Sequence, residues 1–161
     1  MLDRIFPKQF DNAYRGHRLA IWLFVPVVLV KAAQGVNSAI NPRLVMTTAD
    51  GIPVDSFNAA GAEAAVALFA TLGLYVLILP LVSAAALIRY RTMIPFMYLM
   101  LLIVQLGSFA LRFAHPLAGS SAYQATPIGL YINLGFLAVM LVGFALSLLR
   151  AAPTTPNGAQ L

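Results

Sequence analysis

Cysteine is absent from this chain, and charged side chains are scarce. Without a thiol there is no disulfide framework, thiolate metal site, iron–sulfur cluster or cysteine nucleophile. Only 9% of the 161 residues are charged and 61% are hydrophobic, whereas an ordinary soluble domain has about 25% charged residues. A globule of this size keeps too much surface to hide so many apolar side chains. The composition therefore predicts a protein that spans a lipid bilayer.

Recognisable catalytic and cofactor motifs are also missing. No H-E-x-x-H, P-loop or G-x-G-x-x-G pattern is present. The two histidines, His17 and His115, lie at opposite ends of predicted spans, which excludes a haem held by both. A haem held by His17 and a methionine, Met93 or Met97, stays open. We expect no cofactor and no metal; the sequence favours a non-enzymatic role and leaves enzymatic activity open.

Four apolar stretches predict transmembrane helices over residues 17–40, 61–88, 92–114 and 126–149. Pro80 should bend the second of them. The connection over residues 89–91 is so short that the second and third helices must be antiparallel neighbours. Thr92 and Thr126 are the predicted N-caps of the last two helices, and Pro127 fits the first turn of the fourth. The predicted fold is an all-α integral membrane domain over residues 17–150, with four helices in an antiparallel up-down bundle.

The segments outside the four predicted helices differ from them in composition. Residues 1–16 mix apolar and basic side chains, which predicts an interfacial segment on the membrane surface, with a disordered tail as the alternative. Residues 41–60 read as a loop of mixed polarity with turn formers. Residues 151–161 carry no charge, and we expect a disordered tail there. The first apolar run could instead belong to a cleaved signal peptide, but no clean A-x-A site follows it.

Orientation follows from the distribution of positive charge, since cytoplasmic loops are rich in lysine and arginine. With the N-terminus inside, the cytoplasmic side holds Arg4, Lys8, Arg15, Arg18, Arg89, Arg91 and Arg150. The other side has Arg43, and Arg112 near a helix end. We therefore expect a multi-pass protein of the inner membrane with both termini cytoplasmic.

Two polar stripes break the apolar pattern at helical spacing. The first helix has Lys31, Gln34, Ser38 and Asn41, and the third has Gln105, Ser108, Arg112 and His115. In both stripes the steps are three, four and three residues, so each stripe lies on one helix face. The parallel has two explanations, an internal duplication or chance, and chance is favoured because the second and fourth helices do not align.

These stripes define the candidate site. Lipid offers no hydrogen-bond partners, so the polar faces should turn inward and share one interior. With Glu63 near Lys31, and with Asn133 on the fourth helix, a polar cationic cavity would open to the periplasmic side. The full candidate set is Lys31, Gln34, Ser38, Glu63, Gln105, Ser108, Arg112, His115 and Asn133. The competing interpretation is that these groups only hold the helices together.

The sequence does not establish an activity. We expect a non-enzymatic accessory or interaction subunit of a larger membrane complex. The alternative is a ligand-binding or transport protein that uses the outer polar cavity. Expected partners are the lipid bilayer and either a membrane complex or further copies of the chain. Nucleic acid is not expected, because the cations sit at the ends of apolar segments.

Overall fold

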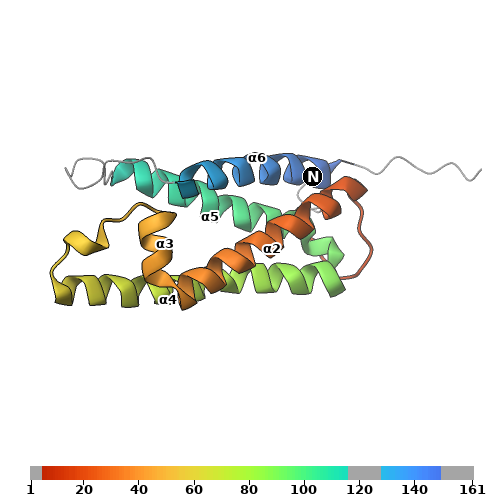
Figure 1. Cartoon of the computed structure of the whole chain (residues 1–161). Coiled ribbons are helices and arrows are strands. Elements are labelled where there is room, and N and C mark those ends of the chain that lie inside the picture. Colours follow the sequence, from red (N-terminus) through yellow and green to blue (C-terminus); the bar gives the residue numbers. More distant parts are fainter. Residues whose placement is uncertain (1–4, 116–127, 150–161) are drawn as a thin grey trace, which may run out of the picture.

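The computed structural model describes residues 5–115 and 128–149, and every regular element in these ranges is helical. Four helices are long and apolar enough to cross a membrane, which confirms the four predicted apolar helices. They are α2 (Arg18–Ile40), α4 (Ala59–Arg89), α5 (Ile94–Ala114) and α6 (Ile128–Leu148). Three shorter helices join them: α3 (Pro42–Thr48), η1 (Val54–Ser56) and η2 (Arg91–Met93). Figure 1 shows α2 running obliquely from the end of α6 towards α4.

Two glycines bring α2 and α4 into close contact. A Cβ atom on Gly35 would lie 2.9 Å from the backbone of Leu77, and one on Gly73 would lie 2.5 Å from the Ala39 nitrogen. Only residues without a side chain permit this backbone approach. The two contacts also fix the register of an antiparallel pair. Gly35 of α2 faces Leu77 of α4, and Ala39, further along α2, faces Gly73, which comes earlier in α4.

The largest core is formed by α2, α4, α5 and α6. Phe24 and Tyr98 are fully buried there, with ring centroids 4.7 Å apart in a tilted arrangement that aromatic pairs prefer. The Tyr98 hydroxyl donates a 2.8 Å hydrogen bond to the Ala20 carbonyl. Gly143 of α6 leaves room for the Tyr98 ring. One aromatic side chain therefore ties three helices together.

The segment expected as a plain loop, residues 41–60, contains α3 and η1. Pro42 opens α3 at its first position, where a proline costs no hydrogen bond. Met46 of α3, Val54 of η1 and Ala62 of α4 form a second, smaller hydrophobic core. These elements stand between α4 and the far ends of α5 and α6 (Figure 1). They form a compact cap over the N-terminal part of α4.

The start of α5 differs from the prediction. Thr92 is not its N-cap: Met93 holds that position, and no side chain makes a capping bond. Thr92 instead binds the N-terminal segment. Its hydroxyl donates to the Asp11 carbonyl at 3.0 Å and accepts from the Asp11 amide at 3.2 Å. The Thr92 hydroxyl therefore satisfies two backbone groups of a residue 81 positions away, and these two hydrogen bonds replace the single capping bond that was predicted.

The structure tests neither of the two proline predictions. Pro80 lies inside α4, which the structure describes as one helix through that residue, and the bend stays a prediction. The predicted cap Thr126 and the adjacent Pro127 lie outside the described residues, as do residues 1–4 and the tail over 151–161.

Candidate functional site

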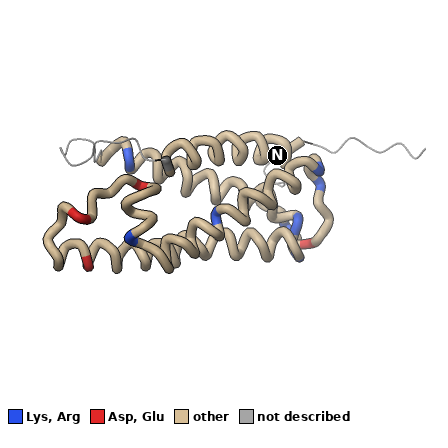
Figure 2. Tube along the Cα trace, viewed as in Figure 1, with Lys and Arg blue, Asp and Glu red and all other residues tan. Residues whose placement is uncertain are grey.

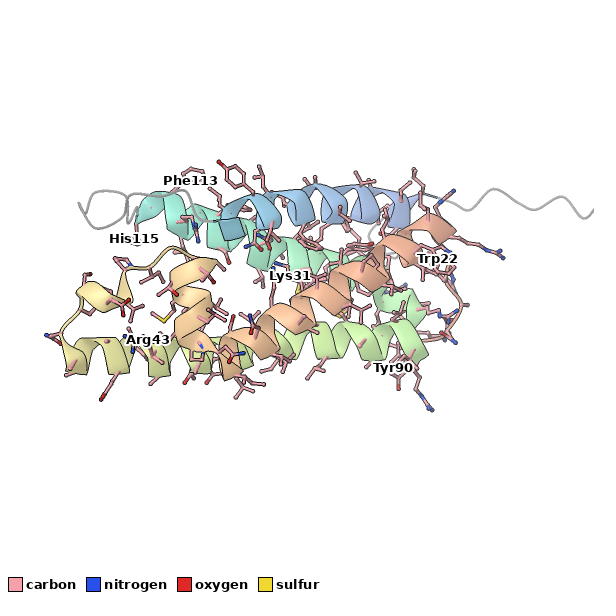
Figure 3. All side chains as sticks on the ribbon, in the orientation of Figure 1. Trp22, Lys31, Arg43, Tyr90, Phe113 and His115 are labelled. Atoms are coloured by element: carbon pink, nitrogen blue, oxygen red, sulfur yellow. The ribbon has the colours of Figure 1, made fainter. Side chains whose placement is uncertain are left out.

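A lysine joins three of the long helices, α2, α5 and α6. The Lys31 ammonium of α2 donates to Gln105 Oε1 of α5 at 2.6 Å and to Asn133 Oδ1 of α6 at 3.0 Å. Asn133 in turn donates to the Gly129 carbonyl at 2.8 Å. Lysine has donors only, so both amides must present their oxygen atoms. Figure 3 shows Lys31 between the ribbons of these helices. We call Lys31, Gln105 and Asn133 the lysine cluster.

The helix rise accounts for this meeting. Lys31 is about 20 Å along its helix from Arg18, at a rise of 1.5 Å per residue. Gln105 is about 21 Å from Arg91 by the same measure. The two residues therefore reach the same level from the same end. This level lies well away from the end where α2 begins, at which lysine and arginine positions gather (Figure 2).

The lysine cluster holds a cation with neutral partners. The chain has five carboxylates, Asp3, Asp11, Asp50, Asp55 and Glu63, and none of them belongs to α2, α5 or α6. Gln105 is buried, and Lys31 and Asn133 are half-buried. Amide oxygens can share the charge through hydrogen bonds, which are stronger when the donor is ionised. The arrangement holds helices together and needs no ligand to complete it.

Glu63 does not accompany Lys31, and that expectation is wrong. Glu63 is exposed and forms no ion pair with Lys31 in the described part of the chain. From the contact between Gly73 and Ser38, Glu63 is ten residues away along α4 and Lys31 is seven away along α2, in opposite directions. That places them about 25 Å apart along the helices. The cause is register: α4 extends beyond the end of α2 and carries Glu63 into the cap.

Arg112, the second predicted cation, belongs to the cap as well. Its guanidinium lies 3.4 Å from Asp50, in the segment between α3 and η1. Burial raises the pKa of Asp50, and the charge and hydrogen bond of Arg112 oppose that rise. A second pair, Arg43 with Asp55 at 2.7 Å, is exposed and joins α3 to η1. These contacts were not foreseen, because a loop offers no periodicity from which to pair charges.

The remaining candidates do not converge on the lysine cluster. Ser108 is exposed and donates to the Val104 carbonyl of its own helix. His115 is exposed at the C-terminal cap of α5 (Figure 3). Gln34 and Ser38 are half-buried, and Ser38 lies against Gly73 at the seam with α4. Between the two predicted stripes, the one hydrogen bond among the described residues joins Lys31 to Gln105.

Other polar groups bear on cofactors and protonation. Among residues 5–115 and 128–149, no three His, Cys, Asp or Glu side chains gather as a metal site would require. His17 caps α2 by accepting from the Leu19 amide at 3.2 Å, while Met97 is buried.

The hydroxyls of Tyr14 and Ser83 are buried with no partner in the described structure. Burial raises the pKa of Tyr14 to about 12, so its hydroxyl stays protonated at neutral pH.

Comparison with known proteins finds no relative. No protein family, no curated protein and no solved structure matches this chain.

Proposed function

We propose that this chain is a non-enzymatic accessory protein of the inner membrane that docks laterally against another membrane protein through α4. Its four apolar helices cross the bilayer as an antiparallel up-down bundle with both termini in the cytoplasm. The register of α2 against α4 and the gathering of cations where α2 begins support this arrangement. The cap formed with α3 and η1 then faces the periplasm.

The separation of the two predicted cations favours docking over ligand transport. A dicationic cavity would need Lys31 and Arg112 around one space. Instead, Lys31 bonds to two amides between the helices and Arg112 bonds to Asp50 in the cap. Both cations have partners within the chain, so neither calls for an anionic ligand. The polar residues of the bundle act as helix-to-helix contacts.

One observation on α4 carries the proposal. Tyr75 is 65% exposed, and its hydroxyl has no hydrogen-bond partner among the described residues. It is the seventeenth of the 31 residues of α4, whereas interfacial tyrosines gather near helix ends. A phenol that faces lipid without a hydrogen-bond partner costs free energy of about 1–3 kcal/mol. A neighbouring protein that supplies an acceptor would remove that cost.

The surroundings of Tyr75 suit a helix partner. We define the outward face of α4 as the exposed residues opposite its buried stripe, namely Ala64, Leu68, Thr71, Tyr75, Ile78 and Val82. Only 11% of the apolar window of α4 is buried in the chain, against 39% for the window that includes α5. Thr71 is small, and its hydroxyl donates to the Ala67 carbonyl of the same helix. A small residue one turn from a tyrosine lets a second helix approach closely.

Site-specific photocrosslinking tests the proposal. A photoreactive residue at Leu68 or Ile78 should link to the same protein partner in native membranes. At Ile103 of α5 or Leu141 of α6, which are also exposed, it should link to lipid. Links to a second copy of this chain would make the complex a homo-oligomer. Equal labelling from all three helices would overturn the assignment of the face.

A pair of conservative variants sharpens the test. Tyr75→Phe removes one hydroxyl and should reduce crosslinking and copurification. Tyr131→Phe on α6 removes a hydroxyl of similar exposure, 64% against 65%, and should change neither. If both variants crosslink like the parent, the Tyr75 hydroxyl does not face a partner.

Orientation is tested with single cysteines, because the chain has none of its own. In intact cells, a membrane-impermeant maleimide that reaches the periplasm should label Ser56→Cys in η1. It should label Gln9→Cys only after permeabilisation. The reverse pattern would invert the topology.

A further inference from the structure

A groove opens at the end of the molecule where α2 begins and α4 ends. Its volume is about 680 Å³, and it is lined by parts of the N-terminal segment, α2, α4 and η2. The lining residues that matter here are Arg18, Ile21, Trp22, Val25, Leu87 and Arg91. The groove lies far from the outward face of α4 around Tyr75, and its occupant is independent of the docking proposed above.

The walls of the groove are fixed by hydrogen bonds. The Asp11 backbone is held by the Thr92 hydroxyl at 3.0 and 3.2 Å, which folds the N-terminal segment against η2. The His17 amide donates to the Leu146 carbonyl at 3.2 Å, which anchors the start of α2 to α6. Arg91 donates from Nε to the Leu87 carbonyl at 3.1 Å. This bond leaves the terminal nitrogens of the guanidinium for another acceptor.

The lining changes from cationic to apolar along the helices. On α2, Arg18 stands at the end, and Ile21 and Val25 follow on the same face one and two turns deeper. On the other wall, Arg91 stands at the end and Leu87 lies one turn deeper along α4. Both walls of the groove therefore have a guanidinium at the same end of the molecule and aliphatic side chains further along the helices.

The charge in this groove has no counterpart in the described chain. Neither Arg18 nor Arg91 forms an ion pair with a carboxylate within residues 5–115 and 128–149. The nearby acid Asp11 pairs with Arg15 at 3.7 Å instead. Guanidinium groups bind phosphate oxygens in a bidentate manner. Two such groups at one opening form a site for a phosphate.

We propose that the groove binds an anionic phospholipid of the adjoining leaflet, with the headgroup phosphate between Arg18 and Arg91 and the acyl chains along Ile21, Val25 and Leu87. Basic pockets between helices at the membrane surface recognise anionic headgroups in this way. Trp22, which is 74% exposed and points away from the bundle at this end (Figure 3), suits the headgroup level. A free phosphate would not use the apolar part of the lining.

Lipid retention in native mass spectrometry tests the proposal. The protein is purified from nanodiscs of phosphatidylcholine alone and of phosphatidylcholine mixed with phosphatidylglycerol, and the bound lipids are counted. The parent should retain phosphatidylglycerol in preference to phosphatidylcholine. Arg18→Gln and Arg91→Gln should each reduce that retention about tenfold, the loss expected for one charged hydrogen bond.

Arg89→Gln is the matched control. Arg89 is exposed at the same end of α4 and its loss changes the net charge equally, but it does not line the groove. This variant should retain phosphatidylglycerol like the parent. If it loses lipid as strongly as Arg91→Gln, diffuse charge and not the groove is responsible, and the proposal fails.

Two further measurements separate the headgroup from other sources of phosphate. Inorganic phosphate added in excess should not displace phosphatidylglycerol, because it lacks acyl chains; displacement would overturn the proposal of a lipid. Val25→Asn, which makes the apolar wall polar, should weaken retention while both arginines remain. Unchanged retention in that variant would contradict the placement of the acyl chains. Circular dichroism of each variant checks that the helices persist.

Discussion

Adding one methyl group at the seam between α2 and α4 should measurably destabilise the fold. In Gly73→Ala the new Cβ would lie 2.5 Å from the Ala39 nitrogen and 2.7 Å from the Ser38 carbonyl carbon. Ordinary contacts between such atoms are about 3.5–4.0 Å. The neighbours are backbone atoms, so relief requires the two helices to move apart by roughly an ångström.

The expected magnitude follows from comparison with a glycine that has space. Overpacking a close contact typically costs about 1–3 kcal/mol. Gly135 of α6 has no atom within 4 Å of its ideal Cβ, so Gly135→Ala should gain about 0.5–1 kcal/mol from the higher helix propensity of alanine. The two variants carry the same chemical change. The propensity gain applies to both variants and cancels, so their unfolding free energies should differ by the overpacking cost, about 1–3 kcal/mol.

Reversible unfolding in mixed detergent micelles measures this difference, with helicity followed by circular dichroism. Gly35→Ala, whose Cβ would meet the Leu77 backbone at 2.9 Å, should resemble Gly73→Ala. Gly107→Ala, with no neighbour within 4 Å, should resemble Gly135→Ala. If Gly73→Ala is as stable as Gly135→Ala, the two helices do not approach at this point and the register derived from it is wrong.

Three further predictions concern the polar contacts. A double-mutant cycle of Lys31→Met and Gln105→Leu in detergent should give a coupling of about 0.6–1.7 kcal/mol, the range for hydrogen bonds between membrane helices; zero coupling would mean that the two groups do not meet. Thr92→Val should speed hydrogen exchange and proteolysis in the N-terminal segment while the long helices stay protected, and unchanged exchange would contradict the clamp. Burial raises the pKa of Asp50 above its unfolded value, so the folded state holds the proton more firmly and stability falls as pH rises from about 4 through the folded pKa. Arg112→Gln removes an opposing charge and should move that fall to higher pH, and a pH profile of thermal unfolding that does not move would refute the pairing.

The four apolar helices could be predicted from the sequence because hydrophobic length is a property of a contiguous stretch. The apolar run that ends before Asn41 and the arginines at 89 and 91 mark helix ends without reference to any neighbour. The meeting of Lys31 with Gln105 follows from similar reasoning. Both are polar, and both lie at a similar distance from a basic helix end.

Relative height could not be predicted in the same way. Glu63 was expected beside Lys31 because both were predicted to lie in the outer halves of their helices. The contact of Gly73 with Ser38 decides instead how far α4 extends past α2, and it leaves Glu63 in the cap. That contact depends on the shape of two helices together, which composition does not encode. The role of Thr92 was missed for a related reason. Its partner, Asp11, is 81 residues away in the sequence, whereas the capping pattern that predicted an N-cap is local.

The distribution of satisfied and unsatisfied polar groups explains why the proposed functions lie on the surface. Lys31, the cation between the helices, has two amide acceptors, so inserting a ligand there would first cost those bonds. Tyr75 on α4 and the arginines Arg18 and Arg91 at the groove retain donors that nothing in the described chain accepts. Unpaired donors are expensive in an apolar environment, and a partner or a lipid can relieve that cost without disturbing the contacts between the helices. We therefore propose that recognition involves the outward face of α4 and the basic end of the molecule, while the lysine cluster joins α2, α5 and α6.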